Sequence, residues 1–340
     1  MRGRHSSEQL RVLVAPDSFK GTFAAPNVAD AIARGLERAG LAADRCPVAD
    51  GGEGTLEAIV AASGGRVVAA PAHDPLGRPI EGRFALLRDG RGALVETAAA
   101  SGLALLAEDE RDPWAASTFG TGELILAAID AGAEVVFVTV GGSATTDGGE
   151  GALQAIDEGG GLRGARLVVL CDVRTPFERA AEVYGPQKGA DPVAVRRLTE
   201  RLHALAGQWP RDPRTRPMTG GAGGLSGGLW AALGAELVPG AGFVLDALRF
   251  DARLKEAGAV FTGEGKLDEQ SLEGKAVGEV ATRARQRGVP CHAIVGEAEL
   301  DRFGRRLLDL DNVVEATTLE EVERAAEALS DRLPRLERRR

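Results

Sequence analysis

Aromatic side chains, cysteines and histidines are all scarce in this sequence of 340 residues. Aromatic residues make up 4% of it, so the core has to be built mainly from Ala, Val and Leu. The three cysteines, Cys46, Cys171 and Cys291, lie far apart and are odd in number, which indicates free thiols in a reducing compartment. No cysteine pair has the spacing of metal ligands, and the four histidines are scattered. The composition therefore argues against a disulfide-rich or zinc-dependent protein.

Long apolar runs and excess positive charge are also lacking. No stretch of about 18 uncharged apolar residues occurs, which argues against a membrane-spanning helix, and residues 1–10 are polar, unlike a signal peptide. The formal net charge is -9, whereas a protein whose main partner is nucleic acid needs a basic surface. We therefore expect a cytoplasmic enzyme or binding protein whose partners are small molecules, not nucleic acid or a membrane.

The common nucleotide-binding motifs are missing as well. The sequence contains no G-x-x-x-x-G-K-[ST] of a P-loop and none of the protein-kinase motifs. Residues 159–164 do match G-x-G-x-x-G, but they precede a predicted strand, whereas a dinucleotide-binding loop follows a strand and opens a helix. A protein that handles phosphates without these motifs must use a less common scaffold.

Glycine, in contrast, is abundant, with 46 residues against a typical share of about 7%. The glycines gather in short loops that follow apolar runs of strand length, and helical patterns follow several of these loops. This repeated order predicts an α/β fold with mainly parallel sheets, in which ligands bind at the carboxyl ends of the strands. The predicted strands are 11–15, 46–49, 67–70, 83–87, 93–96, 134–140, 166–170, 259–262 and 291–295.

Three of the glycine-rich loops, 141–149, 220–228 and 263–266, suit phosphate binding. Glycine lets backbone N–H groups approach an anion closely, and the N-terminus of a following helix adds a favourable dipole. The predicted nucleotide-binding residues are Gly141, Gly142, Ser143, Gly223, Gly224, Gly263, Gly265 and Lys266. Each loop taken alone is explained equally well as a tight turn, but three such turns at strand ends favour a common function.

Carboxylates near strand ends are the candidate metal ligands and general bases. Asp50 precedes a Gly-Gly pair, where it could serve as a helix N-cap, as a Mg²⁺ ligand or as a base. Asp172 ends a continuous apolar run, which favours a functional role. Glu264 and Asp268 flank Lys266, an arrangement that suits either a Mg-nucleotide or a simple surface salt bridge.

Basic residues on these loops are candidates for binding anionic groups. Lys20 follows a predicted buried strand and Lys188 lies in the loop 185–189, so each could neutralise a substrate carboxylate or a phosphoryl group. Lys275 stands at the start of a helix, where the dipole disfavours a cation unless an anion lies nearby. Arg78 lies in a loop rich in Pro and Gly, so it is expected at the surface but could reach an anion.

In their order along the chain, these loops resemble the bacterial glycerate kinase family of the type that lacks P-loop and ribokinase motifs. Eight ordered blocks carry the resemblance, which runs from about residue 11 to 296, and together they are much more specific than any one of them. They are APDSFKG at 15–21, ADGGEGT at 49–55, AASGL at 99–103, FGTGELI at 119–125, GGSATTDGG at 141–149, YGPQKGA at 184–190, GAGGL at 221–225 and TGEGKLD at 262–268.

The resemblance implies a protein of two α/β domains, one formed by both ends of the chain and the other inserted between them, with the active site in the cleft. We place the first domain at 1–72 plus 285–340 and the second at 73–284. The resemblance also implies ATP and Mg²⁺ as cosubstrates, D-glycerate as the acceptor and phosphoglycerate as the product, with 2-phosphoglycerate favoured.

Roles for single residues rest mainly on their positions at strand ends. Asp50 is expected to contact the acceptor hydroxyl group, while Asp172 or Asp268 binds Mg²⁺. Lys20 would balance negative charge on the acceptor carboxylate or the transferred phosphoryl group. The predicted catalytic residues are Asp50, Lys20 and Asp172, the predicted substrate-binding residues are Ser18, Lys188 and Arg78, and the predicted metal ligands are Asp172 and Asp268.

Departures from the family pattern leave the acceptor open. Residues 174–179, RTPFER, are shorter and more charged than the stretch that the family usually has after Asp172. They favour, as an alternative, a kinase of a related small hydroxy acid. A catalytically inactive ligand-binding sensor on the same scaffold is a third interpretation. The sequence leaves the oligomeric state open as well, a homodimer included.

Overall fold

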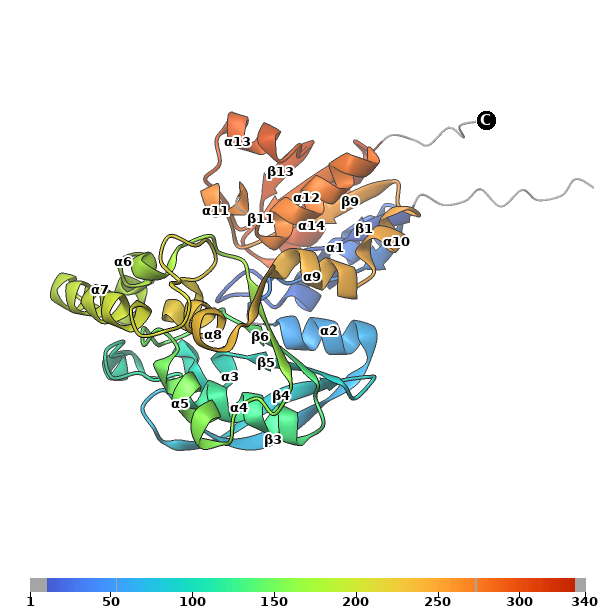
Figure 1. Cartoon of the computed structure of the whole chain (residues 1–340). Helices are drawn as coiled ribbons and strands as arrows, with labels where there is room; N and C mark the ends of the chain where they lie inside the picture. Colours follow the sequence, from blue (N-terminus) through green and yellow to red (C-terminus); the bar gives the residue numbers. More distant parts are fainter. Residues whose placement is uncertain (1–10, 53, 273, 334–340) are drawn as a thin grey trace, which may run out of the picture. The chain divides into compact units, whose positions relative to one another are not determined.

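The computed structural model describes residues 11–333 except 53 and 273, and it divides into two compact units (Figure 1). Unit 1 contains the described residues up to Ala49 together with those from Leu245 onward. Unit 2 contains the described residues between these two segments. Both units are α/β with mainly parallel sheets, as predicted from the sequence.

The unit boundaries differ from the predicted domain limits at 73 and 285. They lie at Asp50 and Leu245, earlier in the chain at both places. The reason is strand pairing, because the strand 65–73 joins the sheet of unit 2, whereas the strand 259–262 joins that of unit 1.

Unit 1 is built on a five-stranded sheet in which every strand runs parallel to its neighbours, in the order β13-β11-β9-β1-β2. The chain places β2 on one side of β1 and then β9, β11 and β13 on the other, so the strand order reverses between β1 and β9. Such a switch point is where ligands bind in open α/β sheets. The strands are β1 (Arg11–Val14), β2 (Ala42–Arg45), β9 (Ala259–Thr262), β11 (Cys291–Val295) and β13 (Asn312–Glu315).

Two pairs of helices pack on this sheet. α1 (Ala25–Arg38) lies along α14 (Leu319–Ser330), and α10 (Phe250–Leu254) contacts α12 (Ala276–Arg287). Right-handed crossovers place α1 and α12 on opposite faces, because β1 to β2 and β9 to β11 cross the sheet in opposite directions. The remaining elements of unit 1 are α11 (Glu269–Leu272), α13 (Arg302–Leu307), β10 (Lys266–Leu267) and β12 (Glu297–Ala298). The helix α9 (Gly240–Ala247) spans the boundary at Leu245, and its Phe243 packs against Phe137 of the unit 2 sheet.

The contact between α1 and α14 depends on Gly35. A Cβ atom at this position would overlap the carbonyl oxygen of Glu323 and lie 3.0 Å from the Cβ atom of Ala326. The carboxylate of Glu323 is in turn paired with Arg34 at 2.8 Å and with Arg38 at 2.6 Å. Glycine inside a helix lowers the free energy of unfolding by about 0.5–1 kcal/mol relative to alanine. At Gly35 this loss is accepted because alanine would not fit between the two helices.

Unit 2 is built on a six-stranded sheet whose strands follow one another in chain order. β3, β4 and β5 are antiparallel neighbours, whereas β5, β6, β7 and β8 are parallel. The parallel half therefore gathers the carboxyl ends of four strands along one edge. The strands are β3 (Gly65–His73), β4 (Pro79–Leu87), β5 (Gly92–Glu96), β6 (Val135–Thr139), β7 (Arg166–Cys171) and β8 (Glu236–Pro239).

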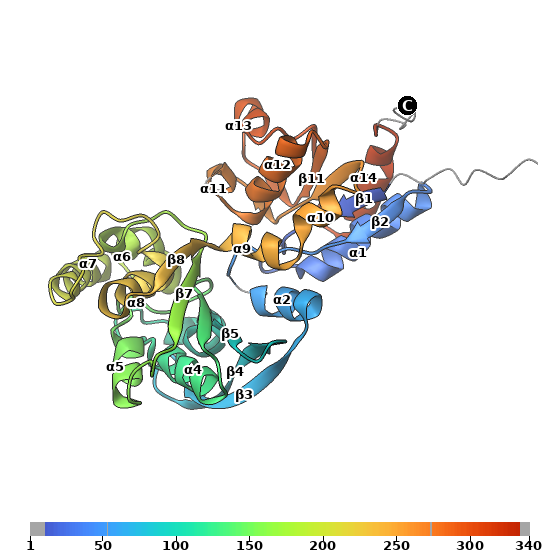
Figure 2. The same ribbon diagram turned by 45° about the vertical axis from the view of Figure 1, so that its right-hand side comes forward.

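Helices cover both faces of this sheet (Figure 2). Gly82 and Arg83 are neighbours on β4 and face opposite sides. A Cβ atom at Gly82 would lie 3.0 Å from the side chain of Leu124 in α4, whereas Arg83 pairs with Glu57 of α2 at 2.7 Å. The helices are α2 (Thr55–Ser63), α3 (Ala98–Ser101), α4 (Phe119–Asp130), α5 (Glu150–Glu158), α6 (Ala180–Tyr184), α7 (Pro192–Ala206) and α8 (Leu225–Leu233). Short 3-10 helices are η1 (Leu103–Leu105), η2 (Glu108–Glu110), η3 (Phe177–Arg179), η4 (Pro186–Lys188) and η5 (Gly221–Gly224).

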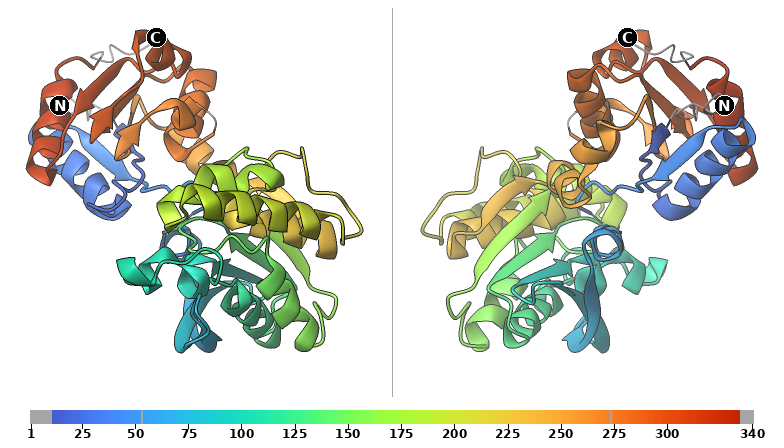
Figure 3. Two further views of the ribbon diagram at one scale, coloured as in Figure 1. Left: turned by 90° about the vertical axis from the view of Figure 1, so that its left-hand side faces the viewer. Right: turned by 90° about the vertical axis from the view of Figure 1, so that its right-hand side faces the viewer.

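A small second core lies beside the sheet of unit 2, between α6 and α7. Phe177 is fully buried there against Leu198 and Leu202, and its ring meets that of Trp209 edge to face at 5.5 Å. The helix α7, the long yellow-green helix in Figure 3, contributes Leu198 and Leu202 to this core. Neither α7 nor any other helix of the described chain combines the length and apolar content needed to cross a membrane.

The predicted strand 46–49 is wrong, although the other predicted strands are present. The strand is β2, which directly precedes it and contains two alanines followed by the charged residues Asp44 and Arg45. β2 lies at the edge of the sheet, where pairing on one side only allows a polar sequence. The backbone then continues alongside β1, because Cys46 N–H donates to the carbonyl oxygen of Val14 at 2.8 Å and Val48 N–H donates to that of Pro16 at 2.9 Å.

Replacing Gly35 by Ala should lower the free energy of unfolding by about 1–3 kcal/mol, because the added methyl group must push α14 away from α1. Gly207→Ala is a matched control, since a Cβ atom there would have only the carbonyl oxygen of Ala204 nearby, at 3.7 Å. Urea unfolding followed by circular dichroism measures both variants. Equal midpoints for the two would show that α1 and α14 do not need a glycine at this contact.

Candidate active site at the strand ends

The predicted site residues fall mainly into two groups, one in each unit, at the carboxyl ends of parallel strands. We call them the unit 1 cluster and the unit 2 cluster. The unit 1 cluster comprises Asp17, Ser18, Lys20, Gly263, Glu264, Gly265, Lys266, Asp268, Ser271 and Lys275. The unit 2 cluster comprises Asp50, Gly51, Gly52, Gly141, Gly142, Ser143, Asp147, Asp172, Lys188, Gly223 and Gly224.

Backbone contacts at the switch point hold the unit 1 cluster together. Asp17 N–H donates to the carbonyl oxygen of Gly263 at 2.8 Å, which joins the loops after β1 and β9. A Cβ atom at Gly263 would overlap the carbonyl oxygen of Ile294 at the end of β11, and one at Gly265 would lie 3.2 Å from the backbone nitrogen of Lys20. Gly263 is therefore needed for the ends of β9 and β11 to approach one another, and Gly265 leaves little room for a side chain beside the loop after β1.

Glu264 is the buried carboxylate of the unit 1 cluster, with 6% of its surface exposed. Ser271 Oγ donates to its Oε1 atom at 2.6 Å, and Lys275 Nζ lies 4.0 Å from its Oε2 atom. Burial raises the pKa of Glu264 to about 7, and the hydrogen bond from Ser271 and the charge of Lys275 oppose this shift. A carboxyl group that titrates near neutral pH beside a switch point is suited to proton transfer.

The cation between the two carboxylates of this cluster is Lys275, not Lys266 as the sequence suggested. Lys266 Nζ pairs instead with Glu299 at 2.7 Å. Lys275 Nζ lies 3.4 Å from Asp268 Oδ1 and 4.0 Å from Glu264 Oε2. Lys275 is the N-cap of α12, where the helix dipole disfavours a cation, and these carboxylates are the anions that such a position requires. Lys266 lies on β10, whose pairing with β12 brings it to Glu299.

Asp147 shapes the loop that follows β6. Its Oδ2 atom accepts hydrogen bonds from the backbone N–H and the Oγ1 of Thr118, both at 2.8 Å, and from Gly151 N–H at 3.2 Å. Its Oδ1 atom accepts from Gly149 N–H at 3.1 Å. These four donors tie the loop to the N-termini of α4 and α5. The contacts give Asp147 a structural role.

Lys188 is almost completely buried, with 2% of its surface exposed, although lysine is rarely found inside proteins. Its Nζ atom donates to Ser143 Oγ at 2.8 Å and to the carbonyl oxygen of Thr145 at 2.6 Å. Burial lowers the pKa of Lys188 to about 7, and the negative charge of Asp147 opposes this shift. Lys188 thus ties η4 to the loop after β6, using two of the three ammonium protons.

The loop 220–224 packs on the loop after β6 through its backbone. Gly223 has a left-handed φ of 65°, and a Cβ atom there would overlap the carbonyl oxygen of Thr145. Gly148 N–H donates to the carbonyl oxygen of Gly223 at 3.0 Å. Gly224 has a φ of 94°, and its Cβ would lie 2.7 Å from the ring of Phe177. Two of the predicted phosphate loops therefore touch each other, with glycine at the contact.

Asp50 is 2% exposed and lies against the ends of β6 and β7. Its Oδ1 atom accepts a hydrogen bond from Gly52 N–H at 2.9 Å, and a Cβ atom at Gly52 would lie 3.5 Å from Gly141 Cα. Burial raises the pKa of the Cys171 thiol, and the negative charges of Asp172 and Asp50 raise it further. Both carboxylates therefore lie close to the end of β7. The fold brings together these two predicted catalytic residues and one of the glycine loops.

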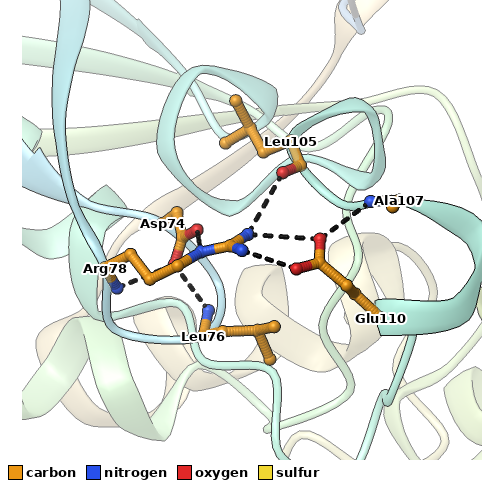
Figure 4. Close-up of polar contacts among 6 residues, drawn as sticks. All are labelled: Asp74, Leu76, Arg78, Leu105, Ala107 and Glu110. Carbon is orange, nitrogen blue, oxygen red and sulfur yellow. Dashed lines mark hydrogen bonds and ion pairs between the residues drawn. The ribbon is translucent and has the colours of Figure 1, made fainter.

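Arg78 is surrounded by acceptors in the turn between β3 and β4 (Figure 4). Its Nε atom donates to Asp74 Oδ2 at 2.5 Å, and its Nη1 atom donates to Glu110 Oε1 at 2.6 Å. Its Nη2 atom lies 3.5 Å from the carbonyl oxygen of Leu105. These contacts join the turn to η1 and η2, and they favour a structural role for Arg78 over the predicted role in substrate binding.

The two predicted metal ligands lie in different units. Asp172 follows β7 in unit 2, and Asp268 follows β10 in unit 1, and each is partly exposed. Within the described ranges, no group of three or more His, Cys, Asp and Glu side chains is arranged to hold a metal ion. Mg²⁺ usually takes one or two carboxylates and completes its shell with water and substrate phosphates. Either aspartate fits that mode of binding, because a carboxylate shared with a phosphate must be accessible.

Two further buried polar residues, one at the end of β5 and one in the unit 1 cluster, were not predicted from the sequence. Glu96 ends β5, is 3% exposed and accepts a hydrogen bond from Leu56 N–H at 3.0 Å. It follows a continuous apolar run, which is the pattern that singled out Asp172, so the same reasoning could have found it. Ser271 is fully buried against Glu264. No sequence pattern indicates a role for Ser271, because its contact with Glu264 depends on how the chain turns between the two residues.

Two α/β units with glycine-rich loops and buried carboxylates at their strand ends are typical of enzymes that bind small ligands. The glycerate kinase family model matches residues 12–160 and 159–339 of this chain. The chain therefore belongs to the glycerate kinase family, and with it to the kinases, which confirms the resemblance carried by the eight sequence blocks.

Individual relatives agree with this assignment. The chain is 39% identical over 332 residues to the glycerate kinase of Bacillus subtilis, a match that covers 86% of each chain. It is 36% identical over 324 residues to the glycerate 2-kinase of Escherichia coli, covering 84% of this chain and 85% of that protein. The structure also matches that of a candidate glycerate kinase 2 from Salmonella typhimurium LT2, with a TM-score of 0.78 and 35% identity, over 96% of this chain and 98% of the other.

Replacing Lys188 by Met should flatten the rise of stability with pH above neutrality. The unfolded chain keeps the Lys188 proton up to a pKa of about 10.4, whereas the folded protein releases it at a pKa of about 7. Between these two values the unfolded state binds more protons, so the free energy of unfolding rises with pH, by at most about 1.4 kcal/mol per pH unit. Urea unfolding of wild type and Lys188→Met across this window gives the two slopes. Equal slopes would contradict the burial of an ionisable group here.

Proposed function

We propose that this protein transfers the γ-phosphoryl group of ATP to the 2-hydroxyl group of D-glycerate, with Mg²⁺ as the accompanying metal. Membership of the glycerate kinase family supports the reaction, and the Escherichia coli relative is named a glycerate 2-kinase. The structural observation that carries the proposal is the gathering of glycine loops and carboxylates at the strand ends. We expect the enzyme to act in the cytoplasm on these small molecules.

In the proposed reaction, Asp50 receives the proton of the acceptor hydroxyl group. The hydroxyl oxygen forms a bond to the γ-phosphorus while the bond from this phosphorus to the β–γ bridging oxygen breaks, and ADP leaves. Asp50 is buried and held by the N–H group of Gly52, so its carboxylate has a fixed position. Such fixed placement is what an efficient general base requires.

The glycine loops would hold the phosphates of ATP. Their backbones are fixed by mutual contact, as for Gly223 on Thr145, so their N–H groups need no reorganisation when charge develops. Lys20 and Ser18 after β1, and the remaining ammonium proton of Lys188, would bind acceptor or phosphoryl oxygens. Asp172 or Asp268 would hold Mg²⁺, which neutralises charge on the phosphates when bound.

A coupled ADP-release assay tests the proposed activity directly. The full chain is supplied with MgATP and, in separate reactions, with D-glycerate, L-glycerate, glycolate, lactate and tartronate. We expect rapid turnover with D-glycerate alone, and NMR of the product should show phosphorus on the carbon-2 oxygen. Phosphorylation at carbon 3 would overturn the assigned product, and turnover with another acid alone would overturn the acceptor.

The segment 174–179 supports a second candidate, a kinase of a related hydroxy acid. This segment is held in place by two contacts. Phe177 is fully buried, and Gly220 N–H donates to the carbonyl oxygen of Thr175 at 2.9 Å. A well-fixed segment of altered sequence directly after Asp172 could change which acceptor fits. The same panel of acids separates the two candidates, and binding without any turnover would favour the sensor interpretation.

Replacing Asp50 by Asn should lower kcat by about 10²–10⁴-fold if this carboxylate is the general base, because the amide cannot accept the proton. The amide oxygen can still accept the hydrogen bond from Gly52, so the thermal midpoint should stay near that of wild type. The kcat of this variant with D-glycerate and its melting curve are measured together. A loss of less than about tenfold in a folded variant would remove Asp50 from this role.

A further inference from the structure

Arg111 is a half-buried arginine without an anionic partner. Its Nε atom is buried and has no hydrogen-bond partner, and within the described chain its guanidinium group forms no ion pair. The other described arginines either pair with an acceptor or an aromatic ring or are exposed to solvent. Burying part of a cation without a partner costs free energy, so such a group in a folded protein calls for an explanation.

The carboxylates on either side of Arg111 in the chain are already engaged. Glu110 accepts hydrogen bonds from Arg78 at 2.6 Å and from Ala107 N–H at 3.0 Å (Figure 4). Asp112 Oδ1 accepts from Trp114 N–H at 2.9 Å. Both neighbouring carboxylates thus form hydrogen bonds with other residues, and neither forms an ion pair with Arg111. This is unexpected for an arginine placed between two acidic residues.

Arg111 also lies next to the unit 2 cluster. A Cβ atom at Gly189 would lie 3.0 Å from the carbonyl oxygen of Arg111 and 3.3 Å from its Cβ atom, so the two backbones are in contact. The residue before Gly189 is Lys188, which donates to the loop after β6. Ala116, shortly after Arg111, packs against Ala144 of that same loop. The segment that carries Arg111 is therefore packed beside Lys188 and the glycine-rich loop after β6.

We propose that Arg111 binds an oxyanion of the reactants at the unit 2 cluster, either the carboxylate of the acceptor or a phosphate of the nucleotide. This inference rests on the proposed function and adds a binding residue to it. The planar guanidinium group matches carboxylate and phosphate oxygens with two parallel hydrogen bonds. A bound oxyanion would accept a hydrogen bond from the buried Nε atom, which has no acceptor in the protein, and would balance the charge of Arg111.

Isothermal titration of the full chain with D-glycerate, with ATP and with inorganic phosphate tests this inference. The variants are Arg111→Gln, which removes the charge, and Arg111→Lys, which keeps the charge but loses the planar fork. The control is Arg66→Gln, because Arg66 is exposed on β3. We expect Arg111→Gln to raise the Kd of D-glycerate or of ATP about tenfold or more, and Arg111→Lys to recover part of the loss. The probe that is weakened identifies the source of the oxyanion.

Stability supplies a second readout. Because Arg111 has no partner in the protein, Arg111→Gln should melt at the temperature of wild type or above it without ligand. It should also lose the rise in melting temperature that the responsive probe gives wild type. Values of Kd within twofold of wild type for all three probes would overturn the inference. A clear drop in the melting temperature of the ligand-free variant would also overturn it, because it would indicate a structural role.

The two proposals fail in distinguishable ways. If wild type binds a probe but phosphorylates no acceptor, the proposed kinase reaction is wrong, and the titrations still decide whether Arg111 binds an oxyanion. If wild type phosphorylates D-glycerate and Arg111→Gln keeps both KM values within twofold, the reaction stands and the role of Arg111 is wrong.

Discussion

The direct contact of one backbone with another at the ends of the parallel strands is the constraint on which both clusters depend. In unit 1 it occurs where Gly263 meets the carbonyl oxygen of Ile294, and in unit 2 where Gly223 meets that of Thr145. No side chain fits at these contacts. The glycines at these two positions therefore allow the backbones to approach closely, and the loops that contain them are held by their neighbours.

Burial acts on both kinds of charge in these clusters and shifts them toward neutrality. It lowers the pKa of Lys188 in unit 2 and raises the pKa of Glu264 in unit 1, each to about 7. The cause is the same, since a low-dielectric environment disfavours the charged form of either group. Each group is stabilised by local hydrogen bonds, from Ser271 for Glu264 and to Ser143 for Lys188. Enclosure within the strand-end loops thus moves the pKa of both groups in the direction that favours the neutral form.

The sequence was sufficient for the fold class, for most strands and for the position of the loops, because hydrophobic runs and glycine clusters are local signals. It failed at β2, whose edge position lets it be polar and hides it from a search for apolar runs. Contacts between side chains of distant segments could not be predicted from the sequence either. The helix-start position of Lys275 indicated a nearby anion, but the sequence did not identify Glu264 and Asp268 as that anion. It also did not show that Glu110 pairs with Arg78 and not with its neighbour Arg111.

Gly51 and Gly240, at the beginning and the end of unit 2, meet so closely that a Cβ atom on Gly51 would lie 2.5 Å from Gly240 Cα. The inserted unit thus starts and finishes at nearly one point, as domains tolerated in the middle of another chain do. The host sheet has β1 and β2 before the interruption and the rest after it, and it is complete without the insert. Unit 2 therefore interrupts the chain of unit 1 between two of its strands without contributing a strand to the sheet of unit 1.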